Sequence, residues 1–270
     1  MRYFLLLTTI LFLSCSSSRN TLTIDDNGAA PLTVSSYADL SVELITRVKN
    51  GQNVDAILET LAKVSVDDLR NDLDTETEKK AFWLNVYNAY IQIILTEDPG
   101  LFENRKKLVG YNFFSSNQMT IAGKSVSFDK IEHGIIRRSK NKYSGGFVGK
   151  LFPGKFERKL RWAKVDPRVH FALNCGAKSC PFIAIYTPDR VEEQLDITTR
   201  DYLAKTTEYD AENDKVKVTS LMSWFRADFG GKKGGVKLLK KYNVIPDEAS
   251  PSVSFLTYDW TLELGNYQDI

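Results

Sequence analysis

Apolar residues in the first hundred positions recur every three or four residues, which is the spacing of helices that bury one face. The pattern predicts one helix over residues 36–51 and another over 54–61. Thr75 and Glu78 then have the spacing of a capping box, in which each side chain satisfies a first-turn amide. They open a long helix that ends before Pro99. Its sequence, KKAFWLNVYNAYIQIIL, is apolar on nearly every side, so we expect this helix to be buried.

The second half of the chain mixes short helices with strands. Residues 119–128 alternate like a hairpin that turns near Gly123, and a second capping box at Asp129 and Glu132 predicts a further helix. More strands are predicted at 169–174, 182–187, 215–219 and 252–262. Because helices and strands follow each other without a regular βαβ alternation, we expect an α+β fold. The N-terminal helices would pack on a small mixed or antiparallel sheet, in a single domain over residues 37–270.

Residues 1–14 have the pattern of a lipoprotein signal peptide. Their apolar run is shorter than the ~20 residues that a membrane-spanning helix needs. Cys15 comes directly after it, so we expect the mature chain to begin there and to be anchored to a membrane by lipid; the alternative is an ordinary cleaved signal with an incidental cysteine. Residues 15–36 are polar and predict a flexible tether. No acidic cluster follows Cys15, which favours a periplasm-facing protein of the bacterial cell envelope.

The charge of the chain argues against a nucleic-acid partner and singles out one basic stretch. The formal net charge is only +2, from 36 basic and 34 acidic residues. Residues 137–168 are different, because eleven Lys or Arg face only Glu157 and Asp166, a local net charge of +9. This stretch fits anionic lipid headgroups or an envelope polymer. The alternative is an ordinary solvated face.

A stripe of amides marks the long helix. Asn85, Asn88 and Gln92 lie three and four residues apart and therefore share one face among apolar neighbours. A buried amide needs partners, because an unpaired one costs about 1–3 kcal/mol. The stripe therefore either lines a polar cavity or holds nearby backbone as a structural clamp.

Four residues could carry chemistry: Glu132, His133, His170 and Cys175. The chain has only two histidines, and a histidine can activate a cysteine thiol as a nucleophile. If the predicted strand stays extended through Cys175, His170 and Cys175 point to opposite faces. Either the strand ends earlier, or Cys175 uses His133 as its partner. The competing interpretation is that these are buried structural residues, since free cysteine is often buried.

Cys175 and Cys180 invite two further interpretations. Four intervening residues allow a disulfide in an oxidising compartment. Together with both histidines, the pair has the ligand types of a zinc site, but the spacing matches no common zinc motif. We therefore expect no metal and no cofactor.

Several segments together resemble the hallmarks of the domain of unknown function 547 family, most strongly over residues 82–203. They are FWLNVYNAY, FDKIEH, DPRVHFALNCGAKSCP, IYT and YDWTL. The resemblance implies that family motif positions are occupied by Asn85, Asn88, Glu132, His133, Arg168, His170, Cys175 and Gly176. Some members of that family carry Ser at the position of Cys180, which argues against an obligatory disulfide or a four-ligand zinc site. The resemblance names a family and supplies no reaction.

Two classes of function follow. The favoured one is a non-catalytic binding or scaffold lipoprotein, in which these residues form a buried polar network. The alternative is a cysteine-dependent envelope hydrolase or acyltransferase that uses Cys175 with His133 or His170. Both interpretations place the candidate residues around one polar pocket. Its predicted lining also includes Asn85, Asn88, Arg168 and Asn174.

Overall fold

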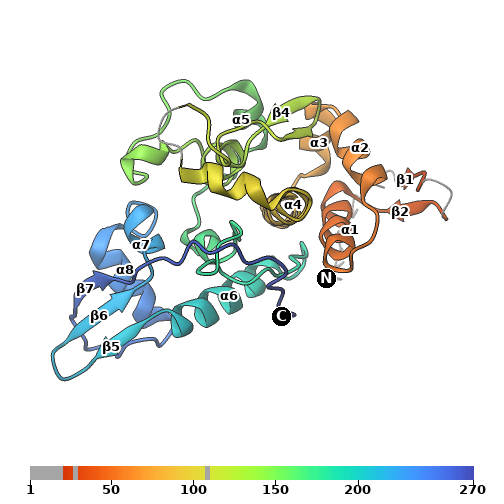
Figure 1. The fold of residues 1–270 in the computed structure, drawn as a ribbon. Helices are drawn as coiled ribbons and strands as arrows, with labels where there is room; N and C mark the ends of the chain where they lie inside the picture. Colours follow the sequence, from red (N-terminus) through yellow and green to blue (C-terminus); the bar gives the residue numbers. More distant parts are fainter. Residues whose placement is uncertain (1–20, 27–29, 107–109) are drawn as a thin grey trace, which may run out of the picture.

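The computed structural model describes residues 21–26, 30–106 and 110–270 and has the α+β fold that the sequence predicts (Figure 1). The signal segment and Cys15 lie outside the described residues. The α-helices are α1 (Tyr37–Lys49), α2 (Asp55–Lys63), α3 (Val66–Asp72), α4 (Glu76–Glu97), α5 (Lys155–Leu160), α6 (Val191–Lys205), α7 (Leu221–Trp224) and α8 (Gly231–Lys241). The 3-10 helices are η1 (Pro99–Lys106), η3 (Lys142–Ser144) and η4 (Pro167–Phe171), and η2 (Lys130–Ile136) is a π-helix.

The long helix α4 forms the centre of the molecule, with α1 packed along it (Figure 1). The predicted capping box is confirmed: the Thr75 hydroxyl accepts from the Glu78 amide at 3.2 Å, and the Glu78 carboxylate accepts from the Thr75 amide at 2.9 Å. The helix ends at Glu97, with Asp98 as its C-cap before Pro99. Its side chains from Ala81 to Gln92 are all buried, as the pattern predicts.

Three small sheets accompany the helices. They are built from β1 (Leu22–Ile24), β2 (Leu32–Val34), β3 (Met119–Ile121), β4 (Lys124–Val126), β5 (Glu208–Asp210), β6 (Lys215–Val218) and β7 (Ser252–Phe255). β1–β2 and β3–β4 are antiparallel pairs, while β6 pairs antiparallel with β5 and parallel with β7. The predicted hairpin turn is confirmed, because Ala122 and Gly123 both adopt positive φ between β3 and β4. β1 and β2 fall within the segment predicted as a tether, and Ile24 is buried in the core.

Three predicted elements around the candidate residues are wrong. One is the strand at 182–187, where only Ile183 forms an isolated bridge. Residues 169–174 are not a strand: Asp166 caps a 3-10 helix with Pro167 in its first turn. A continuous apolar run suits any buried segment, so periodicity could not distinguish the two. The second capping box is also absent: Asp129 has helical backbone angles and makes no capping bond, and its carboxylate binds Lys142 instead.

The buried residues form two adjoining clusters. The larger surrounds α1 and α4, and the smaller joins α8, the β5–β6–β7 sheet and Phe171. After β7 the chain runs back across the middle of the molecule to α1 (Figure 1), where Asp269 pairs with Lys49. On the way it forms isolated bridges with the Cys175–Cys180 loop, at Ala177–Leu262, and beyond it, at Ile183–Tyr267. Across the described ranges, every helix is too short or too polar to span a membrane.

Candidate ligand-binding site

A cavity of about 170 Å³ lies where η2, η4 and α7 meet the C-terminal segment, which is the chain after β7 (residues 256–270). Four of the residues singled out in the sequence line it together: Glu132, His133, His170 and Cys175. Its other lining residues are Tyr87, Phe114, Asp129, Leu173, Leu221, Trp224, Phe225, Tyr258 and Trp260. The tertiary structure thus brings His133 of η2 to the same cavity as His170 and Cys175, which lie in one stretch later in the chain.

The two histidines are joined by a buried chain of charged groups. Arg137 lies one turn after His133 and approaches its Nδ1 atom at 2.8 Å with Nη1. The Arg137 Nε atom donates to Asp228 Oδ2 at 2.5 Å, and the same oxygen lies 2.9 Å from His170 Nε2. A guanidinium can only donate, so His133 Nδ1 accepts and we assign its ring proton to Nε2. This network therefore engages one ring nitrogen of each histidine.

The ionisation of His170 and Asp228 follows from their burial and from their hydrogen-bonded neighbours. Burial lowers the pKa of His170 below its ordinary value, and the positive charge of Arg137 adds to this effect, although Asp228 opposes it. Burial alone would raise the pKa of Asp228, but its bonds to His170 and Arg137 outweigh burial and lower it. Asp228 is therefore a carboxylate held between a guanidinium and an imidazole.

Two carboxylates face the cavity and differ in their partners. Asp129 is bound to Lys142, and its other oxygen lies 3.5 Å from His133 Nε2. The Oε1 atom of Glu132 is buried and has no hydrogen-bond partner among the described residues. It lies 3.6 Å from His133 Nδ1, but that nitrogen already accepts from Arg137. Glu132 therefore offers an unused acceptor to the cavity.

Aromatic rings form much of the remaining wall. Tyr258 contacts both Trp224 and Trp260, with 4.8 Å between ring centroids in each pair. Phe225 stacks on His170 at 3.9 Å, and the Arg137 guanidinium lies 4.6 Å from the same Phe225 ring. The faces of such rings carry partial negative charge, which attracts cations.

Cys175 lines this cavity, but its hydrogen-bond partners among the described residues are not histidines. Its Sγ atom lies 3.8 Å from the Tyr258 hydroxyl, and its backbone N–H donates to Cys180 Sγ at 3.0 Å. The bond to Cys180 and burial raise the pKa of Cys175 well above its ordinary value. Cys175 and Cys180 are both free, without a disulfide between them. The structure thus provides no activated thiolate at position 175.

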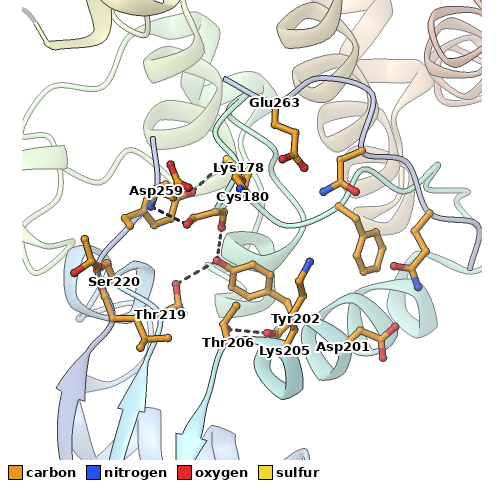
Figure 2. Close-up of a pocket in the computed structure, with 17 residues that line it drawn as sticks. Lys178, Cys180, Asp201, Tyr202, Lys205, Thr206, Thr219, Ser220, Asp259 and Glu263 are labelled. Carbon is orange, nitrogen blue, oxygen red and sulfur yellow. Dashed lines mark hydrogen bonds between the residues drawn. The ribbon is translucent and has the colours of Figure 1, made fainter. Parts of the chain in front are cut away.

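Cys180 faces a second, larger cavity of about 380 Å³ between α6 and the C-terminal segment (Figure 2). Tyr258 lines both cavities. On this side the Tyr202 hydroxyl donates to the carbonyl of Ser179 at 2.7 Å and lies 3.2 Å from Thr219 Oγ1 (Figure 2). The loop that carries both cysteines therefore separates the two cavities.

The residues predicted as a polar pocket lie elsewhere and bind backbone. The Asn85 amide bonds both the carbonyl (2.7 Å) and the N–H (2.9 Å) of Tyr186. Asn88 bonds the carbonyl of Ala172 at 3.0 Å and the N–H of Asn174 at 2.9 Å. These fully buried amides form the structural clamp that the sequence left as one of two alternatives.

Asn174 and Arg168 also lie outside the lining of the cavity. The Asn174 side chain closes its own loop, bonding the Pro181 carbonyl at 2.7 Å and the Gly176 N–H at 2.9 Å. Arg168 binds Asp166 and Glu192 in an ion-pair network at the start of α6. Asn174 therefore holds its own loop and Arg168 holds the start of α6, and neither residue lines the cavity.

Sequence reasoning did not find Arg137, Asp228 or Tyr258 as members of the site. The spacing could have identified Arg137, because it lies four residues after His133 and so shares its side of a helix. Tyr258 belongs to the YDWTL segment, which carried the resemblance but no role. Asp228 lies in an ordinary loop pattern, and only the fold shows that it meets Arg137, 91 residues earlier.

These features define an α+β protein with a buried charged chain beside an aromatic cavity. Residues 71–203 match the family model described as "Protein of unknown function, DUF547", and the chain therefore contains a DUF547 family domain. No curated protein and no solved structure matches the chain. Within the described ranges, no group of three or more His, Cys, Asp or Glu side chains is arranged to hold a metal ion.

Proposed function

We propose that this protein is a non-catalytic binding protein whose 170 Å³ cavity takes a small cationic group, such as a primary amine, beside Glu132. One observation carries the proposal: Glu132 lines an aromatic-walled cavity, and its buried Oε1 atom has no hydrogen-bond partner among the described residues. Leaving such an oxygen unpaired costs about 1–3 kcal/mol or more, because it has lost its hydration. An ammonium group would supply the missing donors.

The charges around the cavity favour a cation over an anion. Asp129 is paired with Lys142, and Asp228 is paired with Arg137, so each of these charges has an opposite neighbour. The Oε1 atom of Glu132 has no hydrogen-bond partner among the described residues, and it lies 3.6 Å from the His133 nitrogen that already accepts from Arg137. Aromatic faces attract cations within about 6 Å of the ring centre, which adds to the preference for an amine.

The same geometry supports binding rather than cysteine catalysis. A cysteine hydrolase of the kind considered above activates its nucleophile with a histidine base within hydrogen-bond reach. Cys175 instead bonds Cys180 and contacts Tyr258, and its pKa is raised chiefly by the Cys180 bond. The nitrogens His133 Nδ1 and His170 Nε2 are engaged with Arg137 and Asp228. Among the described residues neither histidine is hydrogen-bonded to Cys175, so no nucleophile–base pair supports the cysteine-hydrolase alternative there.

Two tryptophans on the cavity wall, Trp224 and Trp260, allow a direct test. The full-length protein is titrated with n-butylamine and with n-butanol, which has the same chain but no charge, and tryptophan fluorescence is followed. We expect the amine to bind more tightly. Glu132→Gln should reduce this preference by about tenfold or more, since a hydrogen bond to a charged group is worth about 1.5–3 kcal/mol.

The exposed Glu97 provides a matched control, because Glu97→Gln removes the same charge far from the cavity lining. It should leave the preference for the amine unchanged. Equal binding of amine and alcohol by the wild type, or an unaltered preference in Glu132→Gln, would contradict the proposal.

We also propose that the protein acts at a membrane surface, anchored by lipid on Cys15 and facing the periplasm. The apolar run that ends at Cys15 supports this location. Metabolic labelling with a clickable fatty acid should tag the wild-type protein and leave Cys15→Ala untagged. Equal labelling of both would refute the anchor.

The basic stretch supports contact with anionic lipid. Residues 137–168 carry a net charge of +9, and this stretch also exposes large apolar side chains. Tyr143, Leu151 and Phe152 are each more than four-fifths exposed, at 87%, 82% and 87%. Basic residues with projecting aromatic and aliphatic side chains suit the surface of an anionic bilayer.

The wild-type protein should float with phosphatidylglycerol vesicles and less with phosphatidylcholine vesicles. Combined Leu151→Ser and Phe152→Ser substitutions should weaken flotation, because two exposed apolar side chains no longer enter the interface. Unaltered flotation of this variant would exclude the loop as the contact. Equal flotation with both lipids would exclude the charge argument.

A further inference from the structure

The two cysteines of the 175–180 loop are not equivalent. Cys180 Sγ accepts the backbone N–H of Cys175 at 3.0 Å and the Tyr258 hydroxyl at 3.2 Å. Cys175 Sγ has a longer contact with the same hydroxyl, at 3.8 Å. Donors that converge on a sulfur stabilise its thiolate, so the loop prepares Cys180 to carry the negative charge.

Ionisation follows the same asymmetry. Burial would raise the pKa of Cys180, but the donors from Cys175 and Tyr258 outweigh burial and lower it. The bond to Cys180 is the main reason that the pKa of Cys175 is raised. Burial also raises the pKa of Tyr258, which therefore remains a protonated donor. Cys180 therefore ionises more readily than Cys175.

The two sulfurs have access from different sides. Cys180 lines the cavity of about 380 Å³, where Figure 2 shows it beside Lys178, and Cys175 lines the smaller one. Cys180 is only 6% exposed, so the disulfide of a folded protein cannot reach its sulfur. A small oxidant can enter the larger cavity.

We propose that Cys175 and Cys180 form a redox-active dithiol, in which the Cys180 thiolate attacks a small hydroperoxide and Cys175 resolves the product. In the first step the thiolate attacks the terminal peroxide oxygen. The O–O bond breaks, Cys180 becomes a sulfenic acid, and the alkoxide or hydroxide leaves and takes up a proton from the solvent. In the second step the Cys175 thiol attacks the sulfenic sulfur, a disulfide forms, and water is released.

The geometry allows this disulfide with little backbone movement. The Cys175 nitrogen lies 3.0 Å from Cys180 Sγ, and an N–Cα bond adds about 1.5 Å. The Cys175 Cα atom is therefore within about 4.5 Å of that sulfur. Rotation of the side chains can then bring the sulfurs to bonding distance, about 2.05 Å. The Tyr258 hydroxyl contacts both sulfurs, at 3.8 Å for Cys175 and 3.2 Å for Cys180, so both sulfurs lie beside one group.

The sequence itself provides the assay. Lys178 lies between the two cysteines, so trypsin places them in separate peptides, 169–178 and 179–190. The folded full-length protein is treated with one equivalent of hydrogen peroxide, alkylated, digested and analysed by mass spectrometry. We expect a linked pair of these peptides, which dithiothreitol separates again. Recovery of the two peptides unlinked, each with its cysteine alkylated, would overturn the proposal.

Variants assign the two roles. Cys175→Ser should accumulate a sulfenic acid at Cys180 that dimedone traps, because the resolving thiol is gone. Cys180→Ser should slow oxidation of Cys175 by about tenfold or more, since Cys175 carries little thiolate. Oxidation of Cys175 in Cys180→Ser at the wild-type rate would reverse the assignment and contradict the proposal.

Tyr258 acts as a positioning residue in this scheme. Tyr258→Phe keeps the ring and removes the donor, so ultraviolet thiolate absorbance and the rate of Cys180 oxidation should both fall, while the thermal midpoint changes little. A drop in the midpoint without a change in thiolate absorbance would show a purely structural hydroxyl. That result would contradict the role given to the Tyr258 hydroxyl.

Discussion

Arg137 and Asp228 form an ion pair with 2.5 Å between Nε and Oδ2, and both side chains are almost completely buried. Arg137 follows η2 and Asp228 follows α7, so the pair connects segments that lie far apart in the sequence. His133 and His170 attach to its two ends. The pair therefore positions both imidazoles on the wall of the 170 Å³ cavity.

Asp228→Asn should destabilise the protein by about 3–5 kcal/mol, because Arg137 would remain buried without its counter-charge. Chemical denaturation measures the loss. The exposed pair of Lys63 and Glu59 on α2 gives a control, since Glu59→Gln breaks an ion pair that solvent already screens. Similar midpoints for both variants would show that the buried pair is not important for stability.

Stability should fall as the pH drops from about 7.5 to about 5.5. The folded pKa of His170 is below its ordinary value, chiefly because of burial, so the unfolded chain binds a proton that the folded chain does not. The stability that His170 contributes is complete above its pKa in the unfolded chain. It is lost as the pH falls toward its lower pKa in the folded protein. Denaturation at several pH values should show the slope, and His170→Gln should flatten it. An equal slope in both proteins would exclude His170 as the titrating group.

Asn88→Ala should destabilise the protein, because it leaves the Ala172 carbonyl and the Asn174 N–H unpaired in the core. The expected cost is about 1–3 kcal/mol for each buried group. The exposed Asn117 is the control, and Asn117→Ala should change the unfolding midpoint little. Equal midpoints for the two variants would mean that the clamp contributes nothing.

Thr75→Ala should lower the free energy of unfolding by about 0.5–2 kcal/mol, the usual loss for an N-cap hydroxyl. The hydroxyl accepts from the Glu78 amide at the start of α4, which carries much of the core. Thr75→Ser keeps this acceptor and should recover most of the stability. A Ser variant as unstable as the Ala variant would point to packing of the methyl group instead.

The sequence by itself determined the elements whose signals are local. The capping box at Thr75, the buried helix α4 and the turn at Ala122–Gly123 depend on residues close together in the chain, so spacing was enough to predict them. The chemical types of the site were visible in the same way, because the chain has only two histidines.

Only the tertiary structure decided which of these residues meet. The run at 169–174 suits any buried segment, and its 3-10 conformation depends on the Asp166 cap and on the Asn88 clamp from α4. Arg137 joins Asp228 across 91 residues, and Tyr258 reaches Cys180 across 78, because the chain after β7 returns past the cysteine loop. Such contacts depend on how whole elements pack, and no short stretch of sequence encodes that packing.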